Sequence, residues 1–501
     1  MSALTASQIQ HRAARGDQGQ EALNPRRRFF AHMCCHVGYH FEPKPSRMTL
    51  RGPNLMLERP KTPVGNAQDN TDALRERLST TTEAYGRFVP REFLNLLGIE
   101  DIRKVALGQQ VERKMTILFA DIRDFTSLSE SMSPQENFNF LNSYLVQMEP
   151  VITAHGGFID KYIGDAIMAL FPDSPDAALR CSLALLERLE EYNAGRQRAG
   201  YRPIKIGIGI NTGIVILGTV GGAARMDGTV IGDAVNLAAR LERLSKGYGV
   251  SILVSEYTLY SLDEPSLWLI RFLDRTHVRG KQDTQSVYEV FSGDPEPLRE
   301  AKARGLKSFE QALAYFHLDD IKSARDQIIA YLATAPDDDA ARVYLERCEV
   351  PSQGPGRSLT DSASPWREEY SFGQVTLDKA HQNLLADMNA LARAVNVGAW
   401  DLTPPLLAQI QLAATNDFAI EEQMMREGDY PFLALHVRQH QRFFEYFGEL
   451  RREIECGEDN CVYLIFRIKR LLTDWLVNHI LSADRHYGHY RHGANRKPAL
   501  P

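Results

Sequence analysis

The sequence predicts a multidomain protein in which an α+β domain with a mixed or antiparallel sheet precedes a helical pair and an all-α four-helix bundle. Three observations lead to this prediction. Residues 111–293 alternate short β-type runs with amphipathic segments, residues 297–350 hold two short amphipathic segments, and the chain from Trp366 onward holds four long ones. With 501 residues, 44% of them hydrophobic, the chain can form several buried cores.

Apolar runs and helical periodicity define the elements of the α+β domain, which we assign to residues 108–293. The run MTILFADI predicts a strand, and helical spacing predicts helices in NFLNSYLVQMEPVITAHG, ALRCSLALLERLEEYN and DAVNLAARLERLSK. The longest apolar stretch, residues 204–222, is rich in glycine and interrupted by Asn211 and Thr212. We therefore expect two strands around a turn in this stretch, and no membrane helix.

The other segments differ from this domain in composition and period. Residues 1–70 are polar and lack a sustained period, so we expect them to be mostly disordered. One helical pair resembles a single tetratricopeptide unit, which cannot bury its apolar face alone and is expected to pack on a neighbour or to dock a protein partner. The remaining predicted boundaries are 71–107 for a helical signalling segment, 294–350 for the helical pair, 351–365 for a Pro/Gly/Ser linker and 366–494 for the bundle.

Bulk properties restrict the function classes. The net charge of −6 gives no reason to expect nucleic-acid binding, and six cysteines in a chain of this length are not a secreted disulfide framework. No secretory signal and no membrane span is predicted. The expected localisation is therefore the cytoplasm.

Two aspartates stand beside apolar runs. Asp121 ends the run ILFAD, and Asp165 follows Gly164 between two apolar runs that suggest a tight hairpin. Carboxylates exposed at strand ends beside a turn are suited to bind hard cations such as Mg²⁺ or Mn²⁺.

The motifs FADIRDFT, GGFIDKYIGDAIMALF, INTG and TVIGDAVNLAARLE occur in this order, and together they resemble the class III adenylate/guanylate cyclases over about residues 108–293. RFVPREFL resembles the signalling helix that precedes many bacterial members. The resemblance implies a ferredoxin-like domain that acts as a head-to-tail homodimer with two metal ions in each site. The metal-binding residues that it implies are Asp121, Asp165 and the carbonyl of Ile122. In this chemistry the ribose 3′-oxygen attacks the α-phosphorus, and the metals assist attack and departure.

The same resemblance assigns roles around the nucleotide. Lys161 and Thr229 match the base-selecting positions and favour ATP over GTP, whereas Glu and Cys-like residues are typical of guanylate cyclases. Asn236 and Arg240 lie four apart, hence on one helix face, and match the ribose-orienting Asn and the Arg that stabilises charge on the α-phosphate. Residues for the outer phosphates are expected to be Arg225, Arg279 and Lys281.

Histidines and carboxylates are dense in the predicted bundle. Each of four helices brings such a side chain to the interior, which suits a non-haem di-iron site. The segments LDKAH, FAIEEQMM, YPFLALHVRQH and WLVNHILSAD resemble the bacterial hemerythrins over about residues 366–490. The iron ligands implied by this resemblance are His381, Glu421, His436, His440, His479 and Asp484, with Glu421 and Asp484 as candidate bridges.

One position departs from the hemerythrin pattern. The family has a histidine four residues before the glutamate, and this chain has Asp417 there. Asp417 shares a helix face with Glu421 and is therefore a candidate iron ligand. An anionic ligand in place of a neutral imidazole would stabilise the ferric state and weaken reversible O₂ binding.

These features predict an adenylate cyclase (a phosphorus–oxygen lyase) that converts ATP to 3′,5′-cyclic AMP and pyrophosphate and is regulated by iron, O₂ or redox state through the bundle. Two alternatives remain at this point. One is a guanylate cyclase, and the other is a non-catalytic iron- or O₂-binding protein that uses a degenerate cyclase domain to dimerise.

Overall fold

The computed structural model describes residues 67–86, 90–222, 224–277, 284–349, 364–371 and 373–494. Contacts divide the chain into one unit of Met1–Ala73 and a second of Leu74–Pro501, and the second unit holds all the features below except residues 67–73. Several predictions fall outside the described residues: the disorder of residues 1–66, most of the 351–365 linker, and the roles of Arg279 and Lys281.

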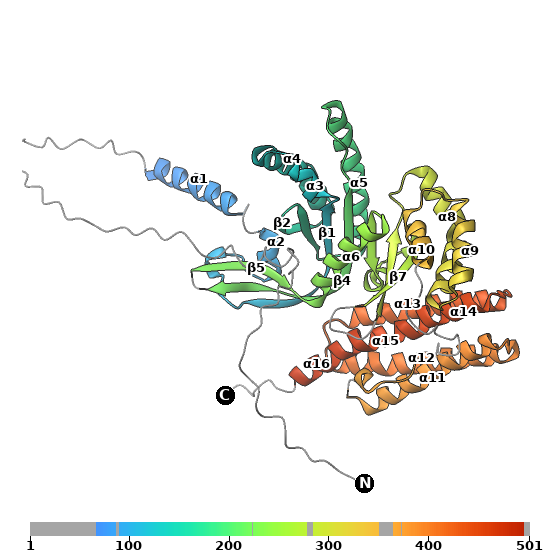
Figure 1. Ribbon diagram of the computed structural model, residues 1–501. Helices are drawn as coiled ribbons and strands as arrows, with labels where there is room; N and C mark the ends of the chain where they lie inside the picture. The colour runs from blue at the N-terminus through green and yellow to red at the C-terminus, as the bar shows by residue number, and fades with distance from the viewer. Residues whose placement is uncertain are drawn as a thin grey trace, which may run out of the picture. The chain divides into compact units, whose positions relative to one another are not determined.

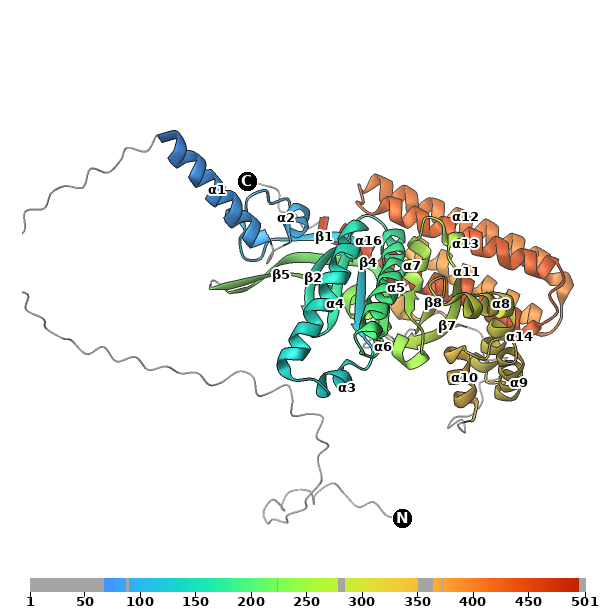
Figure 2. The ribbon, with the colours of Figure 1, turned by 90° about the horizontal axis from the view of Figure 1, so that it is seen from above.

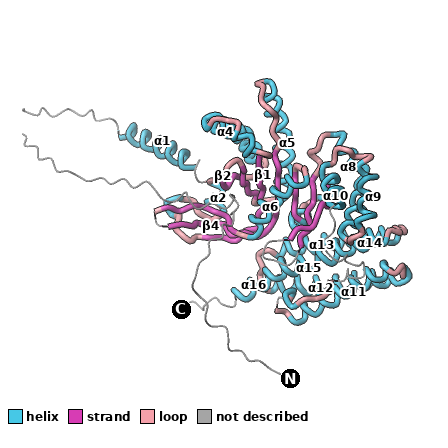
Figure 3. The backbone as a smooth tube through the Cα atoms, viewed as in Figure 1, coloured by secondary structure: helices cyan, strands magenta, loops and turns pink. Residues whose placement is uncertain are grey.

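One sheet of eight strands organises the first domain (Figures 1 and 3). Its order is β2-β3-β1-β4-β6-β8-β7, and β5 pairs with β4. Among the described strands, all pairs are antiparallel except β4 with β6, which is parallel, so the prediction of a mixed or antiparallel sheet is confirmed as a mixed one. The strands are β1 (Gln110–Ile122), β2 (Phe158–Ile163), β3 (Ala166–Phe171), β4 (Ile206–Gly222), β5 (Arg225–Ile231), β6 (Ile252–Ser255), β7 (Ile270–His277) and β8 (Thr284–Val290).

Alternate residues of β1 enter two apolar cores on the two faces of the sheet, as the two-residue period of a strand requires. Leu118 and Ala120 belong to the larger core, with residues of α4 and α5, while Ile117 and Phe119 join a smaller core with Phe93. The helices of this part are α1 (Ala67–Gly86), α2 (Arg91–Leu96), α3 (Phe125–Glu130), α4 (Pro134–Ala154), α5 (Pro175–Arg198), α6 (Asp233–Tyr248) and α7 (Glu256–Ser261).

The prediction of a turn at Asn211 and Thr212 is wrong. Strand β4 runs unbroken through both residues, and all thirteen residues of β1 pair with it, from Gln110 opposite Gly218 to Ile122 opposite Ile206. The long partner strand supplies the hydrogen bonds that local composition did not predict. The glycines serve packing instead, since a Cβ at Gly213 would lie 2.9 Å from the Ala234 side chain of α6.

Three helices, not two, follow the sheet: α8 (Glu296–His317), α9 (Ile321–Leu332) and α10 (Asp339–Glu349). They pack on a neighbour, as a single helical pair is expected to do. The Arg271 guanidinium of β7 is fully buried and binds Asp338, just before α10, and Glu289 of β8. On the other side, Glu310 of α8 accepts from Arg470 of the C-terminal bundle.

The bundle consists of α11 (Val375–Asn396), α12 (Thr403–Glu427), α13 (Leu433–Glu455) and a fourth, interrupted helix, in agreement with the prediction. The fourth helix comprises α14 (Cys461–Ile468), α15 (Trp475–His479) and α16 (Arg485–Ala494), joined by π-helical turns at Lys469–Asp474 and Ile480–Asp484. Such widened turns are frequent at functional sites. No helix in the described ranges has the length and apolar character needed to span a membrane.

The bundle packs directly on the sheet domain, with α13 against α7 (Figure 2). The Tyr260 and Tyr446 rings lie 5.5 Å apart across this interface, and Arg442 donates to the Leu262 carbonyl. One buried apolar cluster runs from the sheet through α8–α10 into the bundle. The two domains therefore share a continuous core.

Candidate functional site

Asp121 and Asp165 lie side by side where β1 ends and the β2–β3 hairpin turns. Gly164 adopts φ +68°, a left-handed conformation that allows the tight turn before Asp165. Burial, together with the hydrogen bond and charge of Asp121, raises the pKa of Asp165 to about 7. One buried oxygen of each, Oδ1 of Asp121 and Oδ2 of Asp165, has no hydrogen-bond partner. Two adjacent carboxylates with open oxygens fit divalent cations.

Three further groups surround this pair. Ile122 has a buried side chain, and its backbone hydrogen-bonds to Asp165. The Tyr144 hydroxyl is buried without a partner, and burial and the charges of both aspartates raise its pKa. Burial and the charge of Asp121 raise the pKa of Glu242, on α6, to about 7. The sequence analysis did not identify Glu242, because nothing in the motif distinguishes it from a solvent-exposed glutamate on a helix.

Lys161 of β2 and Thr229 of β5 meet although 68 residues separate them. The Nζ atom of Lys161 donates to Thr229 Oγ1 over 3.0 Å, and it lies 3.3 Å from Asp160 Oδ2. In the described part of the chain, no hydrogen bond or ion pair joins Lys161 or Thr229 to Asp121 or Asp165. The two base-selecting candidates thus form a group separate from the carboxylate pair.

Asn236 and Arg240 both lie on α6, the first exposed and the second half-buried. Close packing of this helix on β4 holds it in place: a Cβ at Gly209 would lie 2.1 Å from the Glu242 backbone nitrogen. Arg225, at the start of β5, is mostly exposed and pairs with Asp227 at 3.6 Å.

The candidate iron ligands converge in the bundle interior, where all seven are nearly inaccessible to solvent. Two groups have ligand atoms within 4.8 Å of one another: Glu421 with His436, His440 and His479, and Glu421 with His381 and Asp417. Glu421 belongs to both, accepting at Oε1 from His381 (2.7 Å) and at Oε2 from His436 (3.2 Å). Asp484 Oδ1 lies 3.3 Å from His479 Nε2 and 3.5 Å from His436 Nε2.

This geometry has the form of two metal positions that share Glu421. Both oxygens of Asp417 and both of Asp484 are buried without a hydrogen-bond donor. Burial raises the pKa of each of these carboxyls to about 7, with the charge of Glu421 adding to the effect. Burial alone would lower the pKa of His381, but the hydrogen bond and charge of Glu421 raise it to about 9. A buried cluster of this composition fits bound cations, which would satisfy its open oxygens.

Neighbouring side chains fix the imidazole planes. Phe418 stacks on His440 at 3.9 Å between ring centroids, and Trp475 stacks on His479 at 4.7 Å. Glu422, half-buried, lies 2.9 Å from His440 Nδ1, a contact that orients the imidazole of this candidate ligand. The sequence signal for it was the acidic pair in FAIEEQMM, of which only the first glutamate was selected. The Nδ1 atom of His486, on α16, lies 2.6 Å from the Tyr430 hydroxyl, and its Nε2 atom lies 3.0 Å from Glu112 of β1.

Comparison with known proteins assigns both regions to families. The adenylate and guanylate cyclase catalytic domain matches residues 107–291, and the hemerythrin HHE cation-binding domain matches residues 373–489. An adenylate cyclase of Anabaena cylindrica is 45% identical over 220 residues, which are 43% of this chain and 44% of that protein. The terminal-differentiation-specific adenylate cyclase of Dictyostelium discoideum is 36% identical over 282 residues, covering 54% of this chain and 13% of that protein.

Among solved structures, an adenylyl cyclase of P. aeruginosa is 32% identical, with a TM-score of 0.33 over 36% of this chain and 95% of that one. The chain spans less than half the length of the two curated relatives. The similarity to them and the two family matches agree with the motifs and with the fold. The chain therefore combines a catalytic domain of the adenylate and guanylate cyclase family with a hemerythrin HHE cation-binding domain.

Proposed function

We propose that this chain is an adenylate cyclase that converts ATP to 3′,5′-cyclic AMP and pyrophosphate. The observation that carries the proposal is the pair of adjacent carboxylates, Asp121 and Asp165, with open buried oxygens in a matched cyclase domain. Named adenylate cyclases among the relatives support the same activity.

Each proposed site residue has a role that follows from its chemistry. Asp121, Asp165 and the Ile122 carbonyl would hold two Mg²⁺ or Mn²⁺ ions, which supply charge neutralisation and lower the pKa of the ribose 3′-hydroxyl. The 3′-oxygen forms the new bond to the α-phosphorus while the bond to the β-phosphate oxygen breaks, and the hydroxyl proton leaves to solvent. Asn236 would orient the ribose and Arg240 would stabilise charge on the α-phosphate. Arg225, Arg279 and Lys281 remain candidates for binding the outer phosphates.

ATP is the proposed substrate because Lys161 and Thr229 act as one base-reading unit. The ammonium already donates to the threonine hydroxyl, so it is held where one further hydrogen could reach adenine N1. A ring nitrogen that accepts suits a lysine, whereas the protonated N1 of guanine does not. A guanylate cyclase is therefore the less favoured reading.

A head-to-tail homodimer would bring the two groups of site residues together. Lys161 and Thr229 have no described contact with the carboxylate pair of their own chain, which supports a site completed by a second chain. Apolar side chains are exposed on the strands that carry Lys161 and Thr229 and on the adjoining strand β4: Tyr162 and Ile163 on β2, Met226 and Ile231 on β5, and Ile216 and Val220 on β4. An exposed apolar surface of this kind favours association.

The bundle is proposed to bind a non-haem di-iron centre, with Glu421 and Asp484 as bridging carboxylates. The other ligands would be His381, Asp417, His436, His440 and His479. When bound, iron would supply redox and O₂ chemistry to the site. The chain's part is to exclude water from the cluster and to orient its imidazoles.

Regulation of the cyclase by iron or O₂ would pass through the interrupted fourth helix. Asn478, next to His479, donates to Glu256 at the start of α7. Asp474, next to Trp475, pairs with Arg275 of β7 at 2.6 Å. Residues that face the iron cluster therefore alternate along this helix with residues that contact the cyclase domain. A shift of His479 would move the contacts of Asn478 and Asp474 with that domain.

Cyclic nucleotide production by the full-length chain tests this proposal. ATP and GTP are compared with Mg²⁺ or Mn²⁺, in metal-free, diferrous, O₂-exposed and diferric protein. ATP turnover that differs between the iron states is expected. Turnover equal in all four states would remove the regulatory role and keep the enzyme, and absence of turnover in every state would favour the non-catalytic iron-binding reading.

A further inference from the structure

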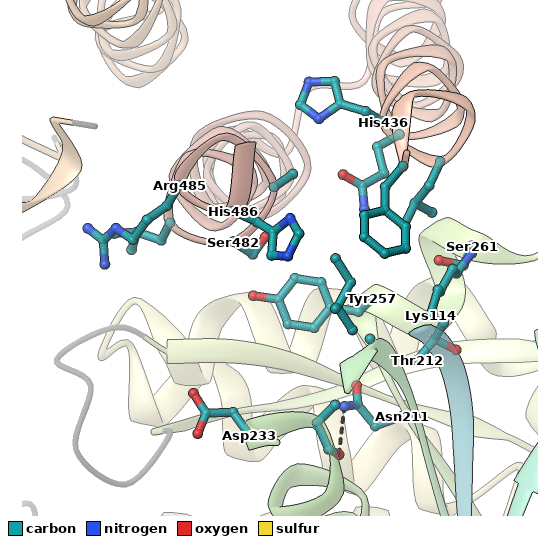
Figure 4. A pocket seen from close by; sticks show the side chains of 18 of the residues that line it. Lys114, Asn211, Thr212, Asp233, Tyr257, Ser261, His436, Ser482, Arg485 and His486 are labelled. Atoms are coloured by element: carbon teal, nitrogen blue, oxygen red, sulfur yellow. Dashed lines mark hydrogen bonds between the residues drawn. The ribbon is translucent and has the colours of Figure 1, made fainter. Parts of the chain in front are cut away.

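A cavity of about 400 Å³ lies between the cyclase sheet and the bundle (Figure 4). Its cyclase side includes Asn211 and Thr212 of β4 and Tyr257 of α7, and its bundle side includes Phe432 and His436. The volume is in the range of sites for small organic ligands, which are mostly apolar with a few placed polar groups.

Polar atoms from both domains are unpartnered at this cavity. Oε1 of Gln285 on β8, Oε1 of Gln439 on α13 and Nδ1 of His436 are buried without a hydrogen-bond partner, and all three residues line the cavity. Gln285 and His436 are more than nine-tenths buried. Buried polar groups are normally paired, so three open atoms in one cavity indicate a ligand or ordered water.

One cation in the wall has no carboxylate partner. Within the described residues, no ion pair or hydrogen bond engages Lys114, and burial lowers the pKa of its ammonium to about 8. Two other basic side chains of the wall are engaged, since Arg485 donates to the Glu369 carbonyl and His486 contacts Tyr430 and Glu112. Lys114 therefore supplies the positive charge that is available to a ligand.

We propose that this cavity binds a small organic carboxylate with an apolar or aromatic body and a hydroxyl group. The carboxylate pairs with Lys114, the body contacts Tyr257 and Phe432, and the hydroxyl donates to a glutamine oxygen. The His436 imidazole directs Nε2 toward Glu421 and leaves Nδ1 open for the ligand.

Such a ligand would contact helix α6 of the cyclase domain and a candidate iron ligand of the bundle. Asp233, Ala234 and Leu237 of α6 line the cavity, and this helix also carries Asn236 and Arg240. On the other side, His436 is one of the candidate iron ligands. The cavity is therefore an effector site through which a metabolite would influence the cyclase helix and the iron cluster together. Binding itself needs no ATP turnover, so its test is independent of the proposed activity.

Isothermal titration calorimetry of the full-length chain with 4-hydroxyphenylacetate tests the proposal. Its neutral isostere, 4-hydroxyphenylacetamide, has nearly the same shape and no charge. We expect saturable binding of the acid, affinity lower by about tenfold or more for the amide, and a similar loss with Lys114→Met. Arg113→Met, which removes the exposed neighbouring cation on the same strand, should leave the affinity unchanged.

Two results would overturn the inference. Absence of saturable binding of the acid at millimolar concentration would mean that the cavity holds water only. Equal affinity for acid and amide, or full affinity in Lys114→Met, would exclude carboxylate recognition. If Lys114→Met does not fold, Gln439→Met on the bundle side replaces it, and unchanged affinity in that variant would count against the site.

Discussion

The ammonium of Lys161 donates to the hydroxyl of Thr229 across a 3.0 Å contact between two strands that are not neighbours in the sheet. Because Thr229 pairs with Gly218 within the β4–β5 hairpin, a shift of that hairpin would alter its contact with the lysine. The contact between the two proposed base-selecting residues therefore depends on the position of β5. Helix α2 takes part in this link, since the Phe93 ring would lie 2.8 Å from a Cβ at Gly228, the residue before Thr229.

Substitution of Lys161 should alter base preference. In Lys161→Glu the ammonium that we propose reads adenine is replaced by an acceptor, so we expect kcat/KM for ATP to fall by roughly 10- to 100-fold. The ratio of GTP to ATP turnover should rise. Initial rates with both nucleotides provide the measurement. Lys246→Glu, which reverses an exposed lysine on α6 that pairs with Asp124, is the matched control. Unchanged ATP kinetics in Lys161→Glu would contradict the assignment.

Cation affinity at the carboxylate pair should depend on pH. In the metal-free chain the pKa of Asp165 is raised to about 7, so below that pH a bound cation must displace a proton. Apparent Mn²⁺ affinity should therefore increase as the pH rises to about 7 and level off above it. The same proton stabilises the folded metal-free chain at low pH, and that contribution is lost as pH rises through about 7.

Asp165→Asn carries no titrating carboxyl, so it should abolish this pH dependence and lower turnover by about 1,000-fold or more. Asp124→Asn, which changes an exposed carboxylate three residues after Asp121, is the control. It should retain both the pH dependence of Mn²⁺ affinity and the turnover. Calorimetric titration of Mn²⁺ at several pH values measures the effect. A pH-independent affinity in the unsubstituted chain would show that Asp165 does not bind the cation.

Much of the fold followed from residue patterns, and the failures have a physical cause. The four bundle segments and the hairpin at Gly164 were predicted because amphipathic period and turn chemistry are local. The unbroken course of β4 was not, because the hydrogen bonds that hold Asn211 and Thr212 in a strand come from β1, about one hundred residues earlier. The helix α10 was missed for a similar reason: its fixed position depends on the buried contact between Arg271 and Asp338.

In the candidate sites too, residues with a local motif were predicted, and residues whose role depends on tertiary contacts were not. Motif positions led to Lys161 and Thr229, and the structure brings them into contact. No local signal marks Glu242, and the only signal for Glu422 is its place beside Glu421. Both gain their significance from residues that fold against them, Asp121 and His440. The position of the cavity between the domains depends on tertiary packing and lies beyond single-sequence reasoning.

Asp417 should set the iron content of the bundle. Asp417→Leu removes the carboxylate beside His381, 3.4 Å away, so we expect the iron content to drop from about two ions per chain to about one. Asp417→His restores the imidazole of the hemerythrin pattern, and it should keep both ions and raise the midpoint potential, because a neutral ligand stabilises the ferric state less. Iron analysis and spectroelectrochemistry measure these effects. Asn416→Ala, at an exposed neighbour, is the control, and full iron content in Asp417→Leu would exclude ligation.

The contact between Asn478 and Glu256 should transmit the state of the iron site. Asn478→Leu removes the donor to a fully buried carboxyl, so the free energy of unfolding should decrease by about 1–3 kcal/mol. Iron content should persist, and the difference in cyclase rate between metal-free and iron-loaded protein should shrink. Asn383→Leu, an exposed asparagine on α11, serves as control. Regulation of unchanged size in Asn478→Leu would place the coupling elsewhere.

Gly209 should be the least replaceable glycine of the cyclase domain. A Cβ there would lie 2.1 Å from the Glu242 nitrogen and 2.5 Å from the Ala238 carbonyl oxygen, both backbone atoms that cannot rotate away. Gly209→Ala must therefore push α6 off β4, and we expect a loss of about 1–3 kcal/mol in stability and a fall in turnover, because α6 carries Asn236 and Arg240.

The matched control is Gly195→Ala within α5, where a Cβ meets nothing within 4 Å. Alanine has the higher helix propensity, so this variant should gain about 0.5–1 kcal/mol. Thermal and denaturant unfolding of the two variants measures the contrast, and equal stabilities would mean that α6 is not held by backbone contact at Gly209.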